Sequence, residues 1–303
     1  MKKLWQPLSD REKLQQVLDA TGMGPVDAAR ELEVTYRTVH RWLKGETKPH
    51  PRESEEIDDL FKAHVDLRPV VDKLKGTIGS PAEQLQENAA LRERLMVMMT
   101  YHSNAIEGSR MTMRETEAAL AGRPVRGKEF PEILEAVNHR NAMSYLIESI
   151  RPGFFIDERY VLDLHARVMY NFNDKLPGRY RTGYVNLTNT EKILPSAQMV
   201  PVKMRQLLAG CNGDDPDLVT QVARDHYEFE SIHPFFDGNG RTGRLLMMAQ
   251  LLRQGLPPAI VEIDDRTKYY MALGKGDMGD FKNMIQVVCE AIMKGYAAFA
   301  EYA

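Results

Sequence analysis

Apolar residues recur at helical spacing along most of the chain, and this periodicity constrains its fold more than any other feature. In the region after residue 81 it predicts helices over 82–101, 112–121, 130–150, 157–171, 201–211, 216–232, 239–254, 265–274 and 280–302. The exception is 179–195, where residues 184–187 and 193–195 flank a polar turn and predict a short β-hairpin. We therefore expect an all-α fold that carries one small hairpin.

A break in the helical pattern at 75–81 divides the chain. Gly76, Gly79 and Pro81 favour turns there. We predict a small N-terminal domain over 1–64, a linker over 65–81 and a large domain over 82–303. Residues 1–52 carry ten Lys and Arg against seven acidic residues, a net charge of +3 that leaves −6 for the rest. This uneven charge indicates two domains with different roles.

The composition excludes several classes of protein. The chain has 303 residues, of which 43% are hydrophobic and 27% charged, as is typical of globular proteins. No apolar run approaches the ~18 residues of a membrane span, so no membrane partner is expected. The first residues lack the apolar stretch of a signal peptide. With only Cys211 and Cys289, neither a disulfide framework nor a cysteine zinc site is expected, and the expected compartment is the cytoplasm.

Residues 233–244 bring together the groups that nucleotidyl transfer needs. A Gly-Asn-Gly turn at 238–240 leads into a predicted helix, where converging N–H groups and the helix dipole favour an anion. Arg241 and Arg244 lie on one side of that helix and can bind successive phosphates. Asp237 offers an oxygen ligand for Mg²⁺ on a polyphosphate, and His233 is a candidate general base.

Other interpretations of this segment fit less well. Gly238, Gly240 and Gly243 have the spacing of a dinucleotide-binding loop, but residues 225–232 before them form a helical pattern rather than a strand. No phosphate-binding loop of the Gly-x-x-x-x-Gly-Lys-[Ser/Thr] type is present. His226, Glu230 and His233 could share a helix face around a metal, although a buried histidine at 226 fits better. A plain turn between helices explains the glycines but not the charged residues.

The segment His-Pro-Phe-Phe-Asp-Gly-Asn-Gly-Arg-Thr-Gly-Arg at 233–244 resembles the signature of the Fic family at every specified position. Weaker similarity covers much of 90–303. The resemblance implies a helical bundle with a β-hairpin flap at about 184–195. It also implies that His233 deprotonates a hydroxyl of a target protein, which then attacks the α phosphorus of ATP.

The same resemblance implies roles for the other residues of the loop. Asp237 would hold Mg²⁺ or Mn²⁺, Arg241 would bind the β phosphate and Arg244 the γ phosphate. Gly238, Asn239 and Gly240 would surround the phosphates. The intact Gly-Asn-Gly favours transfer of AMP over phosphorylation, and UTP or another nucleotide is left open. An exposed strand at 184–187 would add a segment of the target by backbone hydrogen bonding.

A second motif, Ser103-x-x-x-Glu107-Gly108, lies at the end of a predicted helix at about 90–108. A carboxylate at a helix C-terminus is unfavourable against the helix dipole, so Glu107 is expected to have a partner. The motif resembles the inhibitory motif of Fic proteins whose inhibitory helix precedes the core. The resemblance implies that Glu107 pairs with Arg244 and keeps it from the γ phosphate.

The N-terminal segment 26–45 has the pattern helix, short turn, helix. Thr35 is a good N-cap and Gly45 a C-cap, while Val34, Val39, Trp42 and Leu43 form a buried side. The segment resembles the repressor-type (Cro/Xre-like) helix-turn-helix. The resemblance implies that the recognition helix presents five residues to DNA: Tyr36, Arg37, Thr38, His40 and Arg41. A module that binds protein or dimerises is the alternative.

Taken together, the residues and the resemblance predict a protein adenylyltransferase that Glu107 inhibits. Its expected partners are ATP, a target protein that could be the chain itself, and DNA through the N-terminal domain, with a homodimer left open. Two alternatives remain: a DNA-binding regulator whose Fic core senses nucleotide, and a Fic enzyme that also removes AMP.

Overall fold

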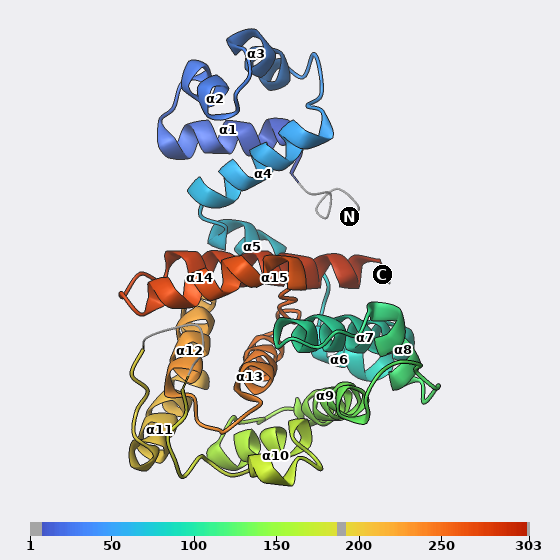
Figure 1. Ribbon diagram of the computed structural model, residues 1–303. Helices are drawn as coiled ribbons and strands as arrows, with labels where there is room; N and C mark the ends of the chain where they lie inside the picture. Colours follow the sequence, from blue (N-terminus) through green and yellow to red (C-terminus); the bar gives the residue numbers. More distant parts are fainter. Residues whose placement is uncertain (1–7, 187–191, 302–303) are drawn as a thin grey trace. The chain divides into compact units, whose positions relative to one another are not determined.

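The computed structural model describes residues 8–186 and 192–301, and the chain divides into two units, Met1–Leu74 and Lys75–Ala303 (Figure 1). The division lies inside the segment 65–81 that the sequence predicts as a linker. Part of that segment is helical, since α5 (Arg68–Leu74) belongs to the first unit. No helix in the described ranges is both long and apolar enough to cross a membrane.

The first unit contains five helices among its described residues: α1 (Asp10–Thr21), α2 (Pro25–Glu31), α3 (Tyr36–Lys44), α4 (Pro51–His64) and α5. Leu14, Val39 and Ile57 are fully buried and join α1, α3 and α4 in one core. Thr35 caps α3 by accepting a hydrogen bond from the N–H of Thr38, and Gly45 ends that helix in the left-handed region. The predicted helix, short turn and helix are therefore present as α2, residues 32–35 and α3.

The second unit contains ten α-helices among its described residues: α6 (Pro81–Glu87), α7 (Ala89–Ile106), α8 (Met113–Leu120), α9 (Phe130–Ser149), α10 (Glu158–Val168), α11 (Val200–Cys211), α12 (Leu218–Ile232), α13 (Asn239–Arg253), α14 (Arg266–Gly276) and α15 (Lys282–Ala300). Three short 3-10 helices connect them: η1 (Asn173–Lys175), η2 (Ala197–Met199) and η3 (Ile263–Asp265). The described part of the unit is helical, as the all-α prediction expects. The two cysteines are buried and unbridged.

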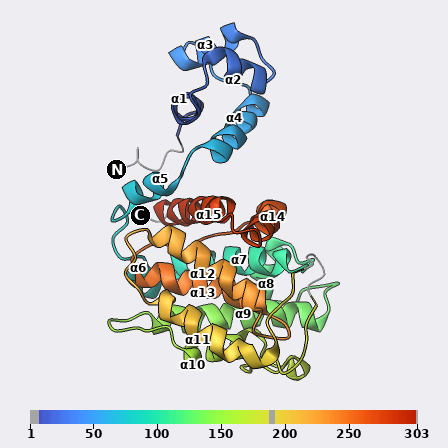
Figure 2. The same ribbon diagram turned by 90° about the vertical axis from the view of Figure 1, so that its left-hand side faces the viewer.

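Helix α13 occupies the middle of this unit. Nearly all of its side chains are buried, because α7, α9, α10 and α12 pack around it (Figures 1 and 2). A helix that is buried on every side is stable only inside a domain. The N-terminus of α13 carries the Gly-Asn-Gly turn, so the fold places that turn among the surrounding helices.

Two expectations about local structure need correction. The single helix predicted over 82–101 is two helices, because Asn88 adopts an extended conformation and its side chain caps α7 through the N–H of Leu91. The predicted hairpin at 184–195 shows no strand at the positions that the structure describes, 184–186 and 192–195, and its turn at 188–190 lies outside them. In place of strand pairing, buried Arg181 binds the carbonyl oxygens at both ends of this segment.

Candidate active site

The predicted catalytic segment forms a tight loop between two helices. Helix α12 ends at Ile232, and His233 adopts a left-handed conformation with φ of 47° that turns the chain. Gly238, with φ of 74°, precedes α13. The side chain of Asn239 accepts a hydrogen bond from the N–H of Phe235 and donates one to its carbonyl oxygen, both at 2.9 Å. Asn239 therefore braces the loop through its amide, while the first N–H groups of α13 have no acceptor within the helix.

Because Gly240 has no side chain, another residue can lie directly against the backbone of the loop at this position. A Cβ atom at this position would lie 2.1 Å from Oε1 of Glu107 and 3.0 Å from Nη1 of Arg244. The carboxylate of Glu107 thus lies directly against the backbone of the Gly-Asn-Gly turn. Any side chain at position 240 would displace it.

The end of α7 carries the residues that hold Arg244. The Nη2 atom of Arg244 donates to Oε1 of Glu107 at 2.7 Å and to the carbonyl oxygen of Ser103 at 2.9 Å, and Nε donates to Oγ of Ser103 at 3.0 Å. Arg244 is buried, while the side chain of Glu107 is 32% exposed. The two predicted motifs, far apart in the sequence, therefore meet at one guanidinium. Gly108 follows Glu107 with φ of 105°, which ends the helix.

His233 is held in its uncharged form. Burial lowers the pKa of its imidazole to about 4, so the ring is neutral at neutral pH. Its Nδ1 atom is buried and has no hydrogen-bond partner among the described residues. A neutral ring with a free nitrogen is suited to accept a proton from a hydroxyl group.

Asp237 and Arg241 form a charged cluster with Glu135, a residue that the sequence analysis missed. Arg241 lies 3.3 Å from Oδ1 of Asp237 and 3.0 Å from Oε1 of Glu135. Oδ1 of Asp237 also accepts a hydrogen bond from the N–H of Gly238 at 2.6 Å. Arg241 is buried, and Glu135 of α9 and Asp237 hold its guanidinium between them.

The residues present fit a magnesium ion that a nucleotide brings with it. The structure shows no group of three His, Cys, Asp or Glu side chains able to hold a metal within the described ranges. Mg²⁺ commonly takes only one or two protein carboxylates and completes its shell with phosphate and water oxygens. The side chain of Asp237 is 43% exposed and is the carboxylate that would hold the ion.

Arg181 is a second residue whose role the sequence analysis missed. It is 2% exposed, and its guanidinium donates to the carbonyl oxygens of His233, Gly183, Pro195 and Ile232. Its own N–H donates to the carbonyl oxygen of Pro234 at 2.9 Å. Arg181 thereby joins both ends of the 184–195 segment to the backbone at His233.

His165 of α10 packs against the catalytic loop and forms a hydrogen bond with its backbone. Its ring stacks on Phe235 with centroids 3.6 Å apart, and its Nδ1 accepts a hydrogen bond from the N–H of Gly178. Its Nε2 atom therefore carries the proton and donates to the carbonyl oxygen of Asp237 at 3.1 Å. His226, the residue with metal-like spacing, is buried instead against Tyr269, with Nε2 2.8 Å from the hydroxyl.

Replacing Arg181 with methionine is expected to destabilise the second unit by about 2–4 kcal/mol, because several buried carbonyl oxygens lose their donor. Urea unfolding followed by circular dichroism measures this loss. Arg179→Met is the matched control, since Arg179 is exposed and lies two residues earlier. Equal stability of the two variants would contradict the role given to Arg181.

Comparison with known proteins shows where this loop and its surroundings recur. Residues 155–251, which include the whole loop, match the family model described as Fic/DOC family. "Protein adenylyltransferase Fic" of Nematostella vectensis is 32% identical over 226 residues, which are 72% of this chain and 52% of that protein. The protein of the same name from Drosophila erecta is 33% identical over 216 residues, 69% of this chain and 43% of that protein. The chain thus spans about half the length of the curated relatives it matches.

Solved structures show the same fold. The crystal structure of a Fic family protein from Desulfovibrio desulfuricans superimposes with a TM-score of 0.62 and 27% identity, covering 78% of this chain and 72% of that one. The family match includes His233, the loop and Arg244, and the relatives extend the similarity over more than two thirds of the chain. The chain therefore belongs to the Fic/DOC family.

Proposed function

We propose that the chain is a protein adenylyltransferase, which transfers AMP from ATP to a hydroxyl group of a target protein. One observation carries the proposal: a neutral imidazole with a free nitrogen lies in the same loop as a glycine turn at a helix N-terminus and two buried arginines. Relatives that are about a third identical bear the name protein adenylyltransferase.

The proposed reaction uses each group of the loop. The neutral imidazole of His233 accepts the proton of the target hydroxyl, and the oxygen forms a bond to the α phosphorus of ATP. The bond from the α phosphorus to the bridging oxygen breaks, and pyrophosphate leaves. The N–H groups at the start of α13 and the charge of Arg241 stabilise the phosphate oxygens. A magnesium ion, when bound at Asp237, would offset the negative charge of the polyphosphate.

The proposal includes inhibition by Glu107. Its carboxylate lies against Gly240 and holds Nη2 of Arg244, where the terminal phosphate of ATP would bind. A carboxylate beside a phosphate is strongly repulsive, and Arg244 cannot bind both in the same geometry. ATP would then bind with its phosphates displaced from the position that transfer needs.

The test of this function is covalent labelling. The protein is incubated with Mg²⁺ and ATP labelled at the α phosphorus, alone and with a cell extract, and proteins are separated under denaturing conditions. Label on the chain or on another protein, with a mass increase equal to AMP, supports the proposal. The same reaction with UTP tests the choice of base. Absence of label from every protein, even with the Glu107→Gly variant, would contradict adenylyl transfer.

We also propose that the N-terminal unit binds DNA. Tyr36, Arg37 and Arg41 of α3 are exposed, while Thr38 and His40 are half-buried. The ring of His40 lies 5.6 Å from that of Tyr36, and the hydroxyl of Thr38 contacts that of Thr35. Three of the five residues implied by the resemblance are thus freely accessible on one helix, which supports recognition of base edges and phosphates.

Arg37→Ala and Arg41→Ala are each expected to weaken DNA binding by about tenfold and to reduce the slope of log K against log salt by about one where the arginine contacts a phosphate. A duplex selected from a random library serves as the probe, with binding measured by fluorescence anisotropy. Arg30→Ala is the matched control on α2, because Arg30 is exposed and forms an ion pair with Asp27 on its own helix. Binding that is the same for all three variants would argue for a protein-binding module instead.

A further inference from the structure

Glu135 of α9 reaches the catalytic loop from outside it, through Arg241. Oε1 of Glu135 lies 3.0 Å from Nη1 of Arg241, and Oδ1 of Asp237 lies 3.3 Å from Nη2 of the same guanidinium. The side chain of Arg241 is 4% exposed, so the two carboxylates share a buried cation. A guanidinium held from two sides keeps one carboxylate when a new ligand takes the other.

The backbone of α9 fixes the place of this glutamate relative to the loop. Three residues further along α9, Nδ2 of Asn138 donates to the carbonyl oxygens of Val168 and Tyr170, at 3.3 and 2.8 Å. Met169 lies between these two residues, and its Sδ atom would be 2.6 Å from a Cβ at Gly238. Helix α9 and the catalytic loop therefore pack against the same turn at the end of α10.

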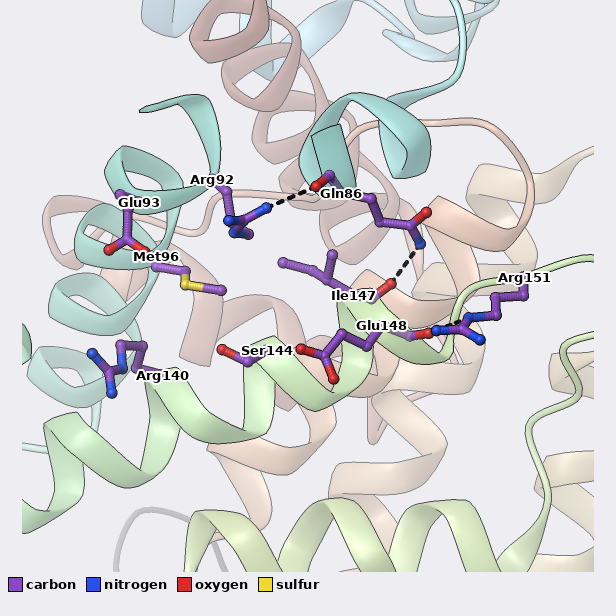
Figure 3. A pocket seen from close by; sticks show the side chains of 9 residues that line it. All are labelled: Gln86, Arg92, Glu93, Met96, Arg140, Ser144, Ile147, Glu148 and Arg151. Carbon is purple, nitrogen blue, oxygen red and sulfur yellow. Dashed lines mark hydrogen bonds between the residues drawn. The ribbon is translucent and has the colours of Figure 1, made fainter. Parts of the chain in front are cut away.

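The other end of α9 is anchored as well. Nε2 of Gln86 donates to the carbonyl oxygen of Ile147 at 2.8 Å, a bond that Figure 3 shows. Ser144 and Glu148 line the pocket drawn in that figure. Helical periodicity places Glu135 on the opposite side of α9 from these two residues. The carboxylate of Glu135 thus belongs to the face of α9 that meets the loop.

The two oxygens of Asp237 have different surroundings. Oδ1 accepts a hydrogen bond from the N–H of Gly238 at 2.6 Å and contacts Arg241. Oδ2 lies 4.0 Å from Nζ of Lys175, which is beyond hydrogen-bond distance. Oδ2 is therefore the oxygen that can bind a metal ion without loss of the bond to Gly238.

The net charge around Asp237 depends on Glu135. The described ion pairs of this cluster join the cations Arg241 and Lys175 to the carboxylates Glu135, Asp237 and Asp174. Three carboxylates against two cations leave one negative charge, which favours a divalent ion. Without Glu135 the cluster is neutral, and Asp237 is the carboxylate left to Arg241, which can bind it through paired hydrogen bonds.

We propose that Glu135 is a positioning residue for AMP transfer, because it holds Arg241 and thereby leaves Asp237 available to the metal ion of the nucleotide. This role rests on the proposed function, since it requires a metal–nucleotide complex at the loop. While Oδ2 of Asp237 binds the ion, Glu135 keeps the guanidinium in place beside the phosphates. Nε of Arg241 is buried without a hydrogen-bond partner among the described residues, and it is the donor left for a phosphate oxygen.

Binding of Mn²⁺, measured by electron paramagnetic resonance, tests this role without any transfer. The full chain carrying Glu107→Gly is saturated with an ATP analogue in which a methylene group joins the α and β phosphates, so that AMP cannot be transferred. Glu135→Gln is expected to weaken Mn²⁺ binding by about tenfold, as is typical when a residue that orients a metal ligand is lost. Glu135→Asp keeps the charge and should lose less.

Glu132→Gln is the matched control, one turn earlier on α9. Its carboxylate accepts hydrogen bonds from the N–H groups of Arg110 and Glu129 rather than from the loop. We expect it to bind Mn²⁺ as the parent does. Unchanged Mn²⁺ binding in Glu135→Gln, or an equal loss in Glu132→Gln, would overturn the proposal.

Initial rates of labelling separate metal binding from the chemical step. In Glu135→Gln the rate should fall about tenfold at limiting Mg²⁺ and recover at saturating Mg²⁺, because the metal affinity changes and the reacting groups do not. A fall that saturating Mg²⁺ does not restore would contradict a role in metal binding. Weaker Mn²⁺ binding in Glu135→Gln with no label from any variant means that the proposed function has failed while the role of Glu135 has not.

Discussion

Replacing Glu107 with glycine is expected to raise the transfer of AMP by about a hundredfold or more. In the structure Oε1 of Glu107 accepts a hydrogen bond from Nη2 of Arg244 and lies 2.1 Å from where a Cβ of Gly240 would be, which is where we propose that a phosphate of ATP binds. Its removal leaves Arg244 fixed by Ser103, and the N–H of Nη2 that Glu107 had bound becomes available to ATP. A correctly placed donor of this kind is worth about 10²–10³ in rate. Initial rates of labelling from ATP with a labelled α phosphorus measure the change.

A second substitution separates the carboxylate from the backbone. Glu107 is the C-cap of α7, so glycine there changes the flexibility of the helix end as well as the charge. Glu107→Ala removes the carboxylate and keeps a Cβ, and we expect it to activate as much as glycine does. Glu107→Gln keeps the shape without the charge and should activate less. Activation by glycine alone would assign the effect to the helix end, and equal labelling by wild type and all variants would exclude inhibition by Glu107.

The fold could be predicted from the sequence because its helices carry their own signals. The apolar spacing of α10, α12 and α15 and the caps at Thr35, Gly45 and Asp157 are local, and each is read within a few residues. The break at Asn88 was missed because the apolar pattern continues across it while the backbone does not. The hairpin was expected because residues 184–187 and 193–195 flank a polar turn. There the described backbone is held instead by Arg181, a contact that no local pattern predicts.

The residues of the candidate site also fall into two groups, those that local sequence predicts and those that only the folded structure brings together. His233, Asp237, Arg241 and Arg244 lie in twelve consecutive residues, and their chemistry is evident from spacing alone. The contact between Glu107 and Arg244 joins residues 137 positions apart, and only the family resemblance implied it. Glu135, His165 and Arg181 lack even that signal, because each is a single polar residue in a helix or loop. These residues could have been found only as polar side chains at positions where the helical pattern predicts an apolar residue. His165 in α10 is such a position, because it is buried.

In the Glu107→Gly background, replacing His233 with alanine is expected to lower the rate of AMP transfer by about a thousandfold, within the range of a lost general base. ATP binding should change little, because the imidazole contacts the hydroxyl rather than the phosphates.

Burial lowers the pKa of His233 to about 4, so the free enzyme holds the neutral ring above that pH and loses it as the pH falls toward 4. The pH profile of kcat/KM is therefore expected to show no fall from this group between pH 8 and 6. Single-turnover labelling of Glu107→Gly with and without His233→Ala, together with calorimetric ATP binding, measures both effects. A rate within tenfold of the parent would show that His233 is not the base, and a fall in kcat/KM centred near pH 6.5 would show that burial does not lower its pKa in the active state.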